Sequence, residues 1–213
     1  MPSPTRSNPP NRHSLLALLC VALLGGCATQ RGIALPEMPD WNARWDALKS
    51  IQDWSFTGRI GVANGEEGFN GRLNWRQSGD QFDASLSGPF GAGRVRIAGS
   101  AERITVTDGD GLQEVLLNPE ADLRYRYGWT IPVKSLRYWA LGVPDPDLPA
   151  GINFSAAGVV ESMDQGGWRV RIPQYRDSGG QPMPRRMIAT QRESRVRLVI
   201  DRWTFHEGSD AAM

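Results

Sequence analysis

The chain has 213 residues, of which 40% are hydrophobic and 22% are charged, and its formal net charge at pH 7 is +1. These values are typical of a folded domain with a sizeable core, and they exclude a disordered chain and a protein built mainly from membrane-spanning helices. The near balance of charge gives no sign of nucleic-acid binding, so we expect no nucleic-acid partner.

Residues 1–26 have the three regions of a signal peptide. A polar stretch containing Arg6 and Arg12 precedes an apolar run over residues 15–24, and two glycines follow. The run is much shorter than the roughly 20 apolar residues that a membrane-spanning helix requires. We therefore predict removal of this segment, which takes the basic count from 24 to 22 against 23 acids, a net charge of −1.

Cys27 ends the sequence Leu-Gly-Gly-Cys, which resembles the lipobox of bacterial lipoproteins. In that motif the cysteine sulfur is acylated, and the cysteine becomes the new N-terminus. The rival, Cys20, follows two leucines, which do not suit a cleavage site for small side chains. Cleavage before Cys27 leaves one cysteine, so an internal disulfide and a thiolate metal cluster are excluded. We predict a lipid anchor at Cys27.

The mature chain is expected to have three parts. Residues 27–39 contain two prolines and are predicted to be a tether between the lipid and the domain. Residues 40–205 are expected to form the folded domain, and the polar residues 206–213 are expected to be a flexible tail.

Alternation of apolar and polar residues predicts about eleven strands. Short turn sequences between the first six favour antiparallel hairpins, so these six are expected to form a meander. The predicted strands contain the segments 54–62, 69–75, 82–86, 95–97, 104–106, 115–117, 152–154, 159–160, 168–172, the region of Met187, and 196–203.

Three short helices are predicted from their start signals. Asp40 is expected to cap the first helix. Asn118 is expected to cap the second, with Pro119 at its first position, and Pro132 opens the third, which ends before Gly142.

Together these elements predict a mainly β fold: an open, incomplete antiparallel β-barrel of about eleven strands. The apolar inner face needs a cover, because sheets do not expose a large apolar face without a partner. We expect a lid of about three short α-helices to supply it. Because such helices do not fill a large concavity, an apolar cavity is expected beneath them.

The sequence lacks the residues of common catalytic sites. Its two histidines, His13 and His206, lie in the predicted signal peptide and tail, so a Ser-His-Asp device or a multi-histidine zinc site is excluded. Residues 108–111 (DGDG) are interpreted as a tight turn, and residues 88–93 precede a strand and not a phosphate-binding helix. We expect no enzyme activity, no metal and no cofactor.

Arg94, Arg96, Arg195 and Arg197 alternate with apolar residues on two predicted strands. Alternation places them on the face opposite the core, where charged residues normally contact water. We interpret them as a solvated face, and a stripe that binds a partner is the alternative.

Several stretches resemble the LolB family of outer-membrane lipoprotein receptors in order and spacing. The resemblance spans roughly residues 41–203. It rests on WSFTGRIGV (54–62), LNW (73–75), GPFG (88–91), IPVKSLRYWALG (131–142), GW (167–168) and LVIDRW (198–203).

The resemblance implies an open β-barrel with a helical lid that accepts acylated lipoproteins from the periplasmic carrier LolA and inserts them into the outer membrane. The implied partners are LolA, the acyl chains of client lipoproteins and outer-membrane lipid. We expect a monomer anchored through Cys27 on the periplasmic face of the outer membrane. The lipobox and the apolar GPFG loop favour the receptor over the soluble carrier. The alternative is a structural or inhibitor-type envelope lipoprotein with a closed β-barrel.

Two sets of site residues follow from the resemblance and the strand phase. Pro89, Phe90 and Gly91 are expected to form a membrane-insertion loop, with Phe90 where the family usually carries leucine. The acyl-chain cavity is expected to be lined by residues of the inward strand phase or the apolar lid face. These are Trp54, Ile60, Val62, Leu73, Trp75, Leu86, Val95, Ile97, Leu136, Trp139 and Trp168.

Overall fold

The structure is a computed structural model, and it describes residues 33–88 and 93–206. These residues belong to one folded unit of the chain, Gly32–Met213. The expectations for the signal peptide and for Cys27, Pro89, Phe90 and Gly91 fall outside the described residues.

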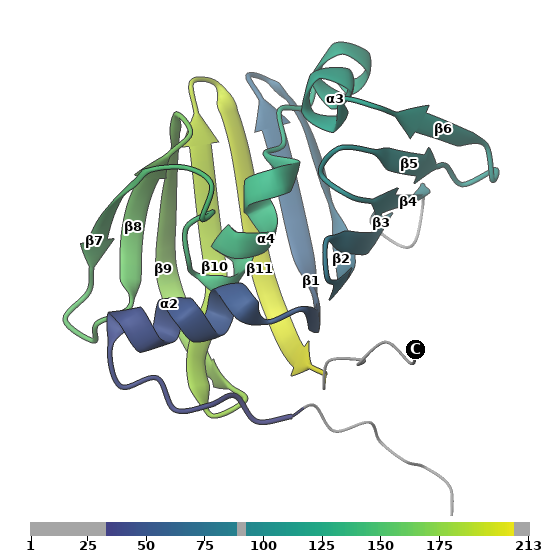
Figure 1. The fold of residues 1–213 in the computed structure, drawn as a ribbon. Coiled ribbons are helices and arrows are strands. Elements are labelled where there is room, and N and C mark those ends of the chain that lie inside the picture. The colour runs from purple at the N-terminus through teal and green to yellow at the C-terminus, as the bar shows by residue number, and fades with distance from the viewer. Residues whose placement is uncertain (1–32, 89–92, 207–213) are drawn as a thin grey trace, which may run out of the picture. The chain divides into compact units, whose positions relative to one another are not determined.

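One antiparallel sheet contains all eleven strands of the described chain (Figure 1). Its spatial order is β6-β5-β4-β3-β2-β1-β11-β10-β9-β8-β7, so the first and last strands pair at its centre. The strands are β1 Asp53–Asn64, β2 Glu67–Ser78, β3 Gln81–Ser87, β4 Arg94–Gly99, β5 Ile104–Thr107, β6 Gln113–Leu116, β7 Ala150–Phe154, β8 Val160–Gln165, β9 Trp168–Ser178, β10 Gln181–Gln191 and β11 Ser194–Phe205.

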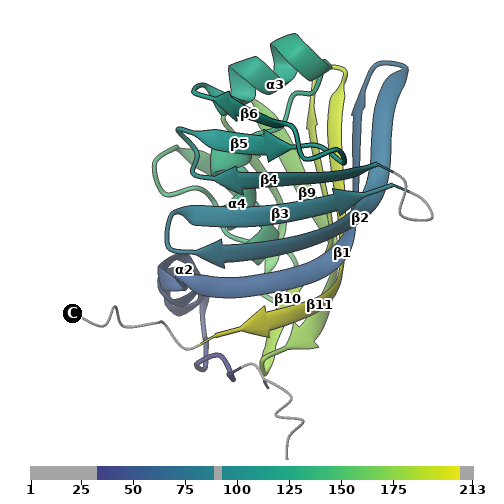
Figure 2. The same ribbon diagram turned by 90° about the vertical axis from the view of Figure 1, so that its right-hand side faces the viewer.

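This order confirms the predicted meander and the open sheet. Consecutive strands β1 to β6 are neighbours, as are β7 to β11, because short turns leave no room for a crossover. Strands β6 and β7 are the two ends of the order, so the sheet is not closed into a barrel. The curvature in Figure 2 gives it a concave inner face.

Three helices in the described part of the chain accompany the sheet: α2 Trp41–Ser50, α3 Pro119–Tyr127 and α4 Val133–Leu141. In Figure 1, α2 and α4 lie on the concave side, and α3 lies beside β6. Asp40 caps α2 as predicted, because its Oδ1 accepts a hydrogen bond of 2.9 Å from the Ala43 N–H. Asn118 is the N-cap residue of α3, but its side chain makes no capping bond, so that part of the prediction is wrong.

Helix α2 docks through an arginine that sequence periodicity does not mark as buried. Arg44 is only 3% exposed, and its Nη2 donates a 2.5 Å hydrogen bond to the Pro182 carbonyl oxygen on β10. Burial disfavours the charged guanidinium and lowers the pKa of Arg44.

A stack of aromatic rings fills one part of the concave face. Trp54 and Phe56 of β1 and Trp75 of β2 stack on one another, with ring centroids 6.1–6.4 Å apart. Phe82 of β3 extends the stack at 4.6 Å from Trp75. Pairs at these separations contribute beyond the area they bury, so this stack stabilises the packing of β1, β2 and β3 against one another.

Gly58 sits where β1 shifts its register against β11. A Cβ atom at Gly58 would lie 2.2 Å from the Val199 carbonyl oxygen, and backbone atoms on both sides cannot move apart without breaking the ladder. The centre of the sheet therefore requires glycine at this position.

We predict that Gly58→Ala lowers the free energy of unfolding by about 3 kcal/mol, because the methyl group overpacks the β1–β11 ladder. Gly61→Ala on the same strand is the matched control, since its Cβ would meet only the movable side-chain oxygen of Asn70. Urea denaturation of both variants measures the difference. Equal stabilities would contradict the assignment of Gly58 as a packing constraint.

Candidate functional site

An apolar cavity lies between the β1–β4 half of the sheet and the segment containing α3 and α4. Its volume is about 50 Å³, and every residue that lines it is apolar. The lining residues are Ile60, Leu73, Trp75, Phe82, Ala84, Leu86, Ile97, Leu123, Ile131, Val133 and Leu136.

Six of the eleven residues expected to line an acyl-chain cavity meet here, and they are Ile60, Leu73, Trp75, Leu86, Ile97 and Leu136. The other five do not line this cavity. Trp54, Val62, Trp139 and Trp168 are buried in the surrounding core, and Val95 is half-buried against it.

Five lining residues were missing from the sequence-based set. Phe82 and Ala84 share the inward phase of β3 with Leu86, so the strand pattern already contained the signal for them. Val133 lies one helical turn before Leu136 and shares its face. Leu123 of α3 and Ile131 of the following link carried no periodic signal, because their placement depends on how α3 folds back over the sheet.

The cavity is smaller than the sequence led us to expect. For comparison, an engineered apolar cavity of about 150 Å³ in another protein binds one benzene molecule. At about 50 Å³ the described conformation is closed to an acyl chain. Entry of a longer apolar ligand therefore requires that the helices above the cavity move.

One side of α4 is held by a buried amide. Gln165 of β8 accepts hydrogen bonds at Oε1 from Trp139 Nε1 (2.7 Å) and from the Asp145 N–H (2.9 Å). Its Nε2 donates to the carbonyl oxygens of Asp145 and Leu148, both at 2.9 Å. All the polar positions of this amide that face the core are therefore paired, which makes the attachment costly to break.

Asp145 strengthens the same attachment. It is fully buried, its Oδ2 accepts a 2.9 Å hydrogen bond from the Ser135 hydroxyl of α4, and its Oδ1 accepts one from the Asp147 N–H. A buried carboxylate satisfied on both oxygens fixes the geometry around it. Helix α4 and the segment that follows it are thus fixed to β8.

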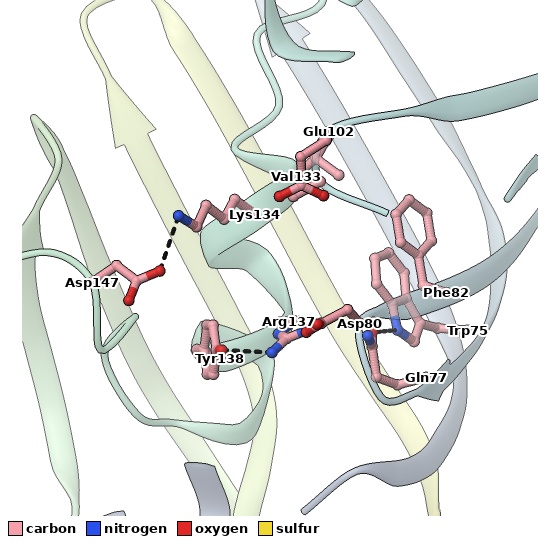
Figure 3. A pocket seen from close by; sticks show the side chains of 11 residues that line it. Trp75, Gln77, Asp80, Phe82, Glu102, Val133, Lys134, Arg137, Tyr138 and Asp147 are labelled. Carbon is pink, nitrogen blue, oxygen red and sulfur yellow. Dashed lines mark hydrogen bonds and ion pairs between the residues drawn. The ribbon is translucent and has the colours of Figure 1, made fainter. Parts of the chain in front are cut away.

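The opposite side of α4 faces a polar pocket of about 190 Å³ (Figure 3). It shares Trp75, Phe82 and Val133 with the apolar cavity, so the two spaces adjoin. Its other lining residues are Gln77, Asp80, Ala101, Glu102, Lys134, Arg137, Tyr138 and Asp147.

Arg137 bridges this pocket from α4 to the β2–β3 turn. Its Nη1 donates to Asp80 Oδ1 at 2.7 Å and to the Gly79 carbonyl oxygen at 3.2 Å, and its Nη2 donates to the Tyr138 hydroxyl at 2.6 Å. Partial burial disfavours the guanidinium charge, but the hydrogen bonds to Asp80 and Tyr138 outweigh it and raise the pKa of Arg137. Because the Asp80 side chain is 84% exposed, the ion pair between Arg137 and Asp80 is weak compared with the buried hydrogen bonds of Gln165 and Asp145.

Two more charged groups line the pocket. Lys134 of α4 pairs with Asp147 at 3.0 Å, and the hydrogen bond and charge of Asp147 raise the pKa of the lysine. The Ser100 hydroxyl donates to Glu102 at 2.7 Å and lowers the pKa of that carboxyl. The pocket therefore carries both signs of charge at neutral pH beside an apolar cavity.

The fold defines a class. The sheet and helices are similar to the solved structure of a LolA superfamily protein from Nitrosomonas europaea, with a TM-score of 0.52 and 9% sequence identity over 78% of this chain and 93% of that one. The chain therefore has a fold similar to that of this protein.

Sequence comparison then gives the family. The model for outer membrane lipoprotein LolB matches residues 52–203. The outer-membrane lipoproteins LolB of Chromohalobacter salexigens and Cellvibrio japonicus are each 33% identical to the chain, over 88% and 89% of its length and 88% and 95% of theirs. The chain belongs to the LolB family of outer-membrane lipoproteins, which confirms the resemblance of its motifs.

Within residues 33–88 and 93–206, no helix is long and apolar enough to cross a membrane. The same part of the chain contains no group of three or more histidine, cysteine or acidic side chains placed to hold a metal ion.

We predict that Gln165→Leu lowers the free energy of unfolding by about 3 kcal/mol, because the indole N–H of Trp139 and the Asp145 N–H lose their acceptor while staying buried. Gln191→Leu is the control. It removes one exposed hydrogen bond of 3.3 Å and should cost about 0.5 kcal/mol or less. Urea denaturation measures both, and similar losses would contradict the role of Gln165 as the anchor of α4.

Proposed function

We propose that this protein is the outer-membrane receptor that accepts acylated lipoproteins from LolA in its apolar cavity and inserts them into the outer membrane. The observation that carries the proposal is the wholly apolar cavity beneath a helix held by buried hydrogen bonds on one side and by an ion pair with an exposed carboxylate on the other, in a chain of the LolB family.

The energetics of acyl chains favour such a site. Each buried methylene is worth roughly 0.8 kcal/mol, so the chains of one lipoprotein cannot cross the periplasm unprotected. A lining without hydrogen-bonding groups holds the chains without directional contacts. Transfer to the bilayer is then downhill, provided that the cavity solvates the chains less well than lipid does.

We assign the opening of the cavity to the side of α4 that is held by the exposed ion pair between Arg137 and Asp80. The buried bonds of Gln165 and Asp145 keep one side attached to β8, so α4 turns about that side when the Arg137–Asp80 tie breaks. This motion joins the polar pocket to the apolar cavity, because the two already share Trp75 and Phe82 in their walls. The polar groups of the client then face the charged pocket while its chains enter the cavity.

Two further assignments rest on the sequence and the family. Cys27 carries the acyl anchor on the periplasmic face of the outer membrane. Phe90, between Pro89 and Gly91, enters the bilayer and brings the mouth of the cavity against lipid. No metal, cofactor or catalytic step is part of the mechanism, since moving an acyl chain between apolar environments breaks no covalent bond.

A second function has one observation in its favour. The cavity of about 50 Å³ is what a structural envelope lipoprotein with a packed interior would also show. The two functions differ in whether the interior opens, and uptake of a fluorescent fatty acid by the purified protein distinguishes them.

A transfer assay with a cavity-filling variant tests the proposal directly. LolA loaded with an acylated lipoprotein is mixed with the purified protein and lipid vesicles, and lipoprotein in each fraction is measured. Ala84→Leu should reduce acceptance about tenfold or more, the effect expected of added methylenes in an apolar pocket. Ala98→Leu, on the neighbouring strand β4 but outside the cavity lining, is the control. If wild type accepts nothing from LolA, the receptor function is wrong.

We predict that Asp80→Asn speeds uptake of a fluorescent fatty acid by up to about fivefold, the range of an exposed ion pair, because it weakens the Arg137 tie. Stopped-flow fluorescence measures the rate. Asp83→Asn removes the carboxylate paired with Arg96, which does not border the cavity, and should leave the rate unchanged. A slower rate in Asp80→Asn would rule out opening at this side of α4.

We predict that Phe90→Glu abolishes insertion into vesicles while acceptance from LolA persists, because a charged residue does not enter lipid. Leu112→Glu places the same charge at an exposed apolar residue elsewhere and should insert normally. If Phe90 acts outside the core as proposed, the melting temperature should change little in either variant. Normal insertion by Phe90→Glu would overturn the assignment of this residue.

A further inference from the structure

A hollow of about 590 Å³ lies on strands β2, β1 and β11, and three arginines line it beside the apolar side chains of Ile60 and Val199. Figure 2 shows these strands side by side in the sheet. The residues that form the hollow include Arg59, Gly61, Asn70, Arg72, Ser87 and Arg197. They alternate along their strands with the buried core residues, so they belong to the outer face.

The strand register gathers three arginines around one glycine. Gly61 of β1 is paired with Asn70 on one side and with Arg197 on the other. Two residues earlier on β1 and on the same outer face, Arg59 lies opposite Arg72 of β2. Side chains opposite each other on one face of a sheet have Cβ atoms only about 5 Å apart. The guanidinium groups therefore border the space above Gly61.

These positive charges are poorly compensated by the protein. Arg59 pairs with Asp201 at 3.1 Å, and Asp201 is shared with Arg185 at 3.6 Å. Arg72 and Arg197 have no hydrogen bond or ion pair through their side chains with any described residue. Like charges directly opposite each other destabilise a sheet, so an anion bound between them would be favourable.

We propose that this hollow binds the phosphate group of an anionic phospholipid headgroup, an inference that rests on the proposed function and adds a contact with the membrane to it. Guanidinium groups match phosphate oxygens with paired donors, and the Asn70 amide adds another donor at the edge. A phosphate of a membrane lipid is favoured over free phosphate because Ser87 and Gly88 line the hollow. In the sequence these residues directly precede Pro89, Phe90 and Gly91, which are proposed to insert into the membrane. Arg59, Arg72, Ser87 and Arg94 lie opposite one another on successive strands from β1 to β4. This row extends the positive charge beyond the hollow, so the surface can contact several headgroups.

Gly61 makes the hollow, and filling it leaves the charge unchanged. A Cβ atom at Gly61 would lie 2.5 Å from Asn70 Oδ1, the end of a side chain that can rotate away, and Gly61 does not have a positive φ. Valine is also favoured in strands. Gly61→Val should therefore fold normally while its side chain occupies the space assigned to the phosphate.

The test is sedimentation of the mature chain, residues 27–213 with Cys27→Ala, with phosphatidylcholine vesicles that contain or lack phosphatidylglycerol. Arg72→Gln and Arg197→Gln should each lower partitioning onto the anionic vesicles about fivefold, the effect of one basic contact with an anionic membrane. Gly61→Val should lower it by a similar factor, because the valine side chain blocks the contact between the phosphate and these arginines. Arg171→Gln removes the same charge from β9, away from the hollow, and should change partitioning by about twofold or less in physiological salt.

Three results would overturn the inference. An equal loss with Arg171→Gln would mean general attraction of a basic face, and unchanged partitioning of Gly61→Val would mean that the hollow is not the binding site. Saturable binding of inorganic phosphate without preference for the anionic vesicles would identify a free-phosphate site. Uptake of the fluorescent fatty acid is measured on each variant, and it should stay normal because Gly61, Arg72 and Arg197 do not line the cavity. A failure of uptake in wild type would instead count against the proposed receptor function.

Discussion

The structure depends on one constraint: an antiparallel sheet whose inner face is apolar on nearly every strand must be covered. A fully packed cover would make a rigid core, and no cover would leave that face in water. Part of the cover is α4, attached to β8 by the buried amide of Gln165 and to the β2–β3 turn by the exposed carboxylate of Asp80. The proposed opening depends on this difference between a buried and an exposed attachment.

The two faces of the central strands differ in chemistry. Along β1, Ile60 lines the apolar cavity, while its neighbours Arg59 and Gly61 line the hollow and not the cavity. Under the functions proposed above, period-two alternation would place an apolar lining for acyl chains and a charged surface for headgroups on the same few residues. A lipoprotein has both kinds of group, as does the membrane that receives it.

The strands, their hairpin connections and the open sheet were predictable because period-two alternation and short turns depend on local sequence. The lining residues Ile60, Leu73 and Leu86 were predictable for the same reason. The volume of the cavity was not, because it depends on how Leu123 and Ile131 pack over strands distant in sequence. The Trp139–Gln165 hydrogen bond and the Arg137–Asp80 ion pair join residues 26 and 57 positions apart in the sequence, and no periodic pattern predicts such pairs.

The pairing of β1 with β11 at the centre of the sheet also constrains when the protein can fold. Each half of the sheet consists of local hairpins, but within the sheet the halves are hydrogen-bonded to each other only through β1 and β11, which lie at opposite ends of the domain. Contacts between residues so far apart in sequence form slowly, because a long loop must close first. The interior therefore cannot assemble until the last strand has been synthesised and exported. Until then its apolar strands remain exposed, and we expect them to depend on periplasmic chaperones.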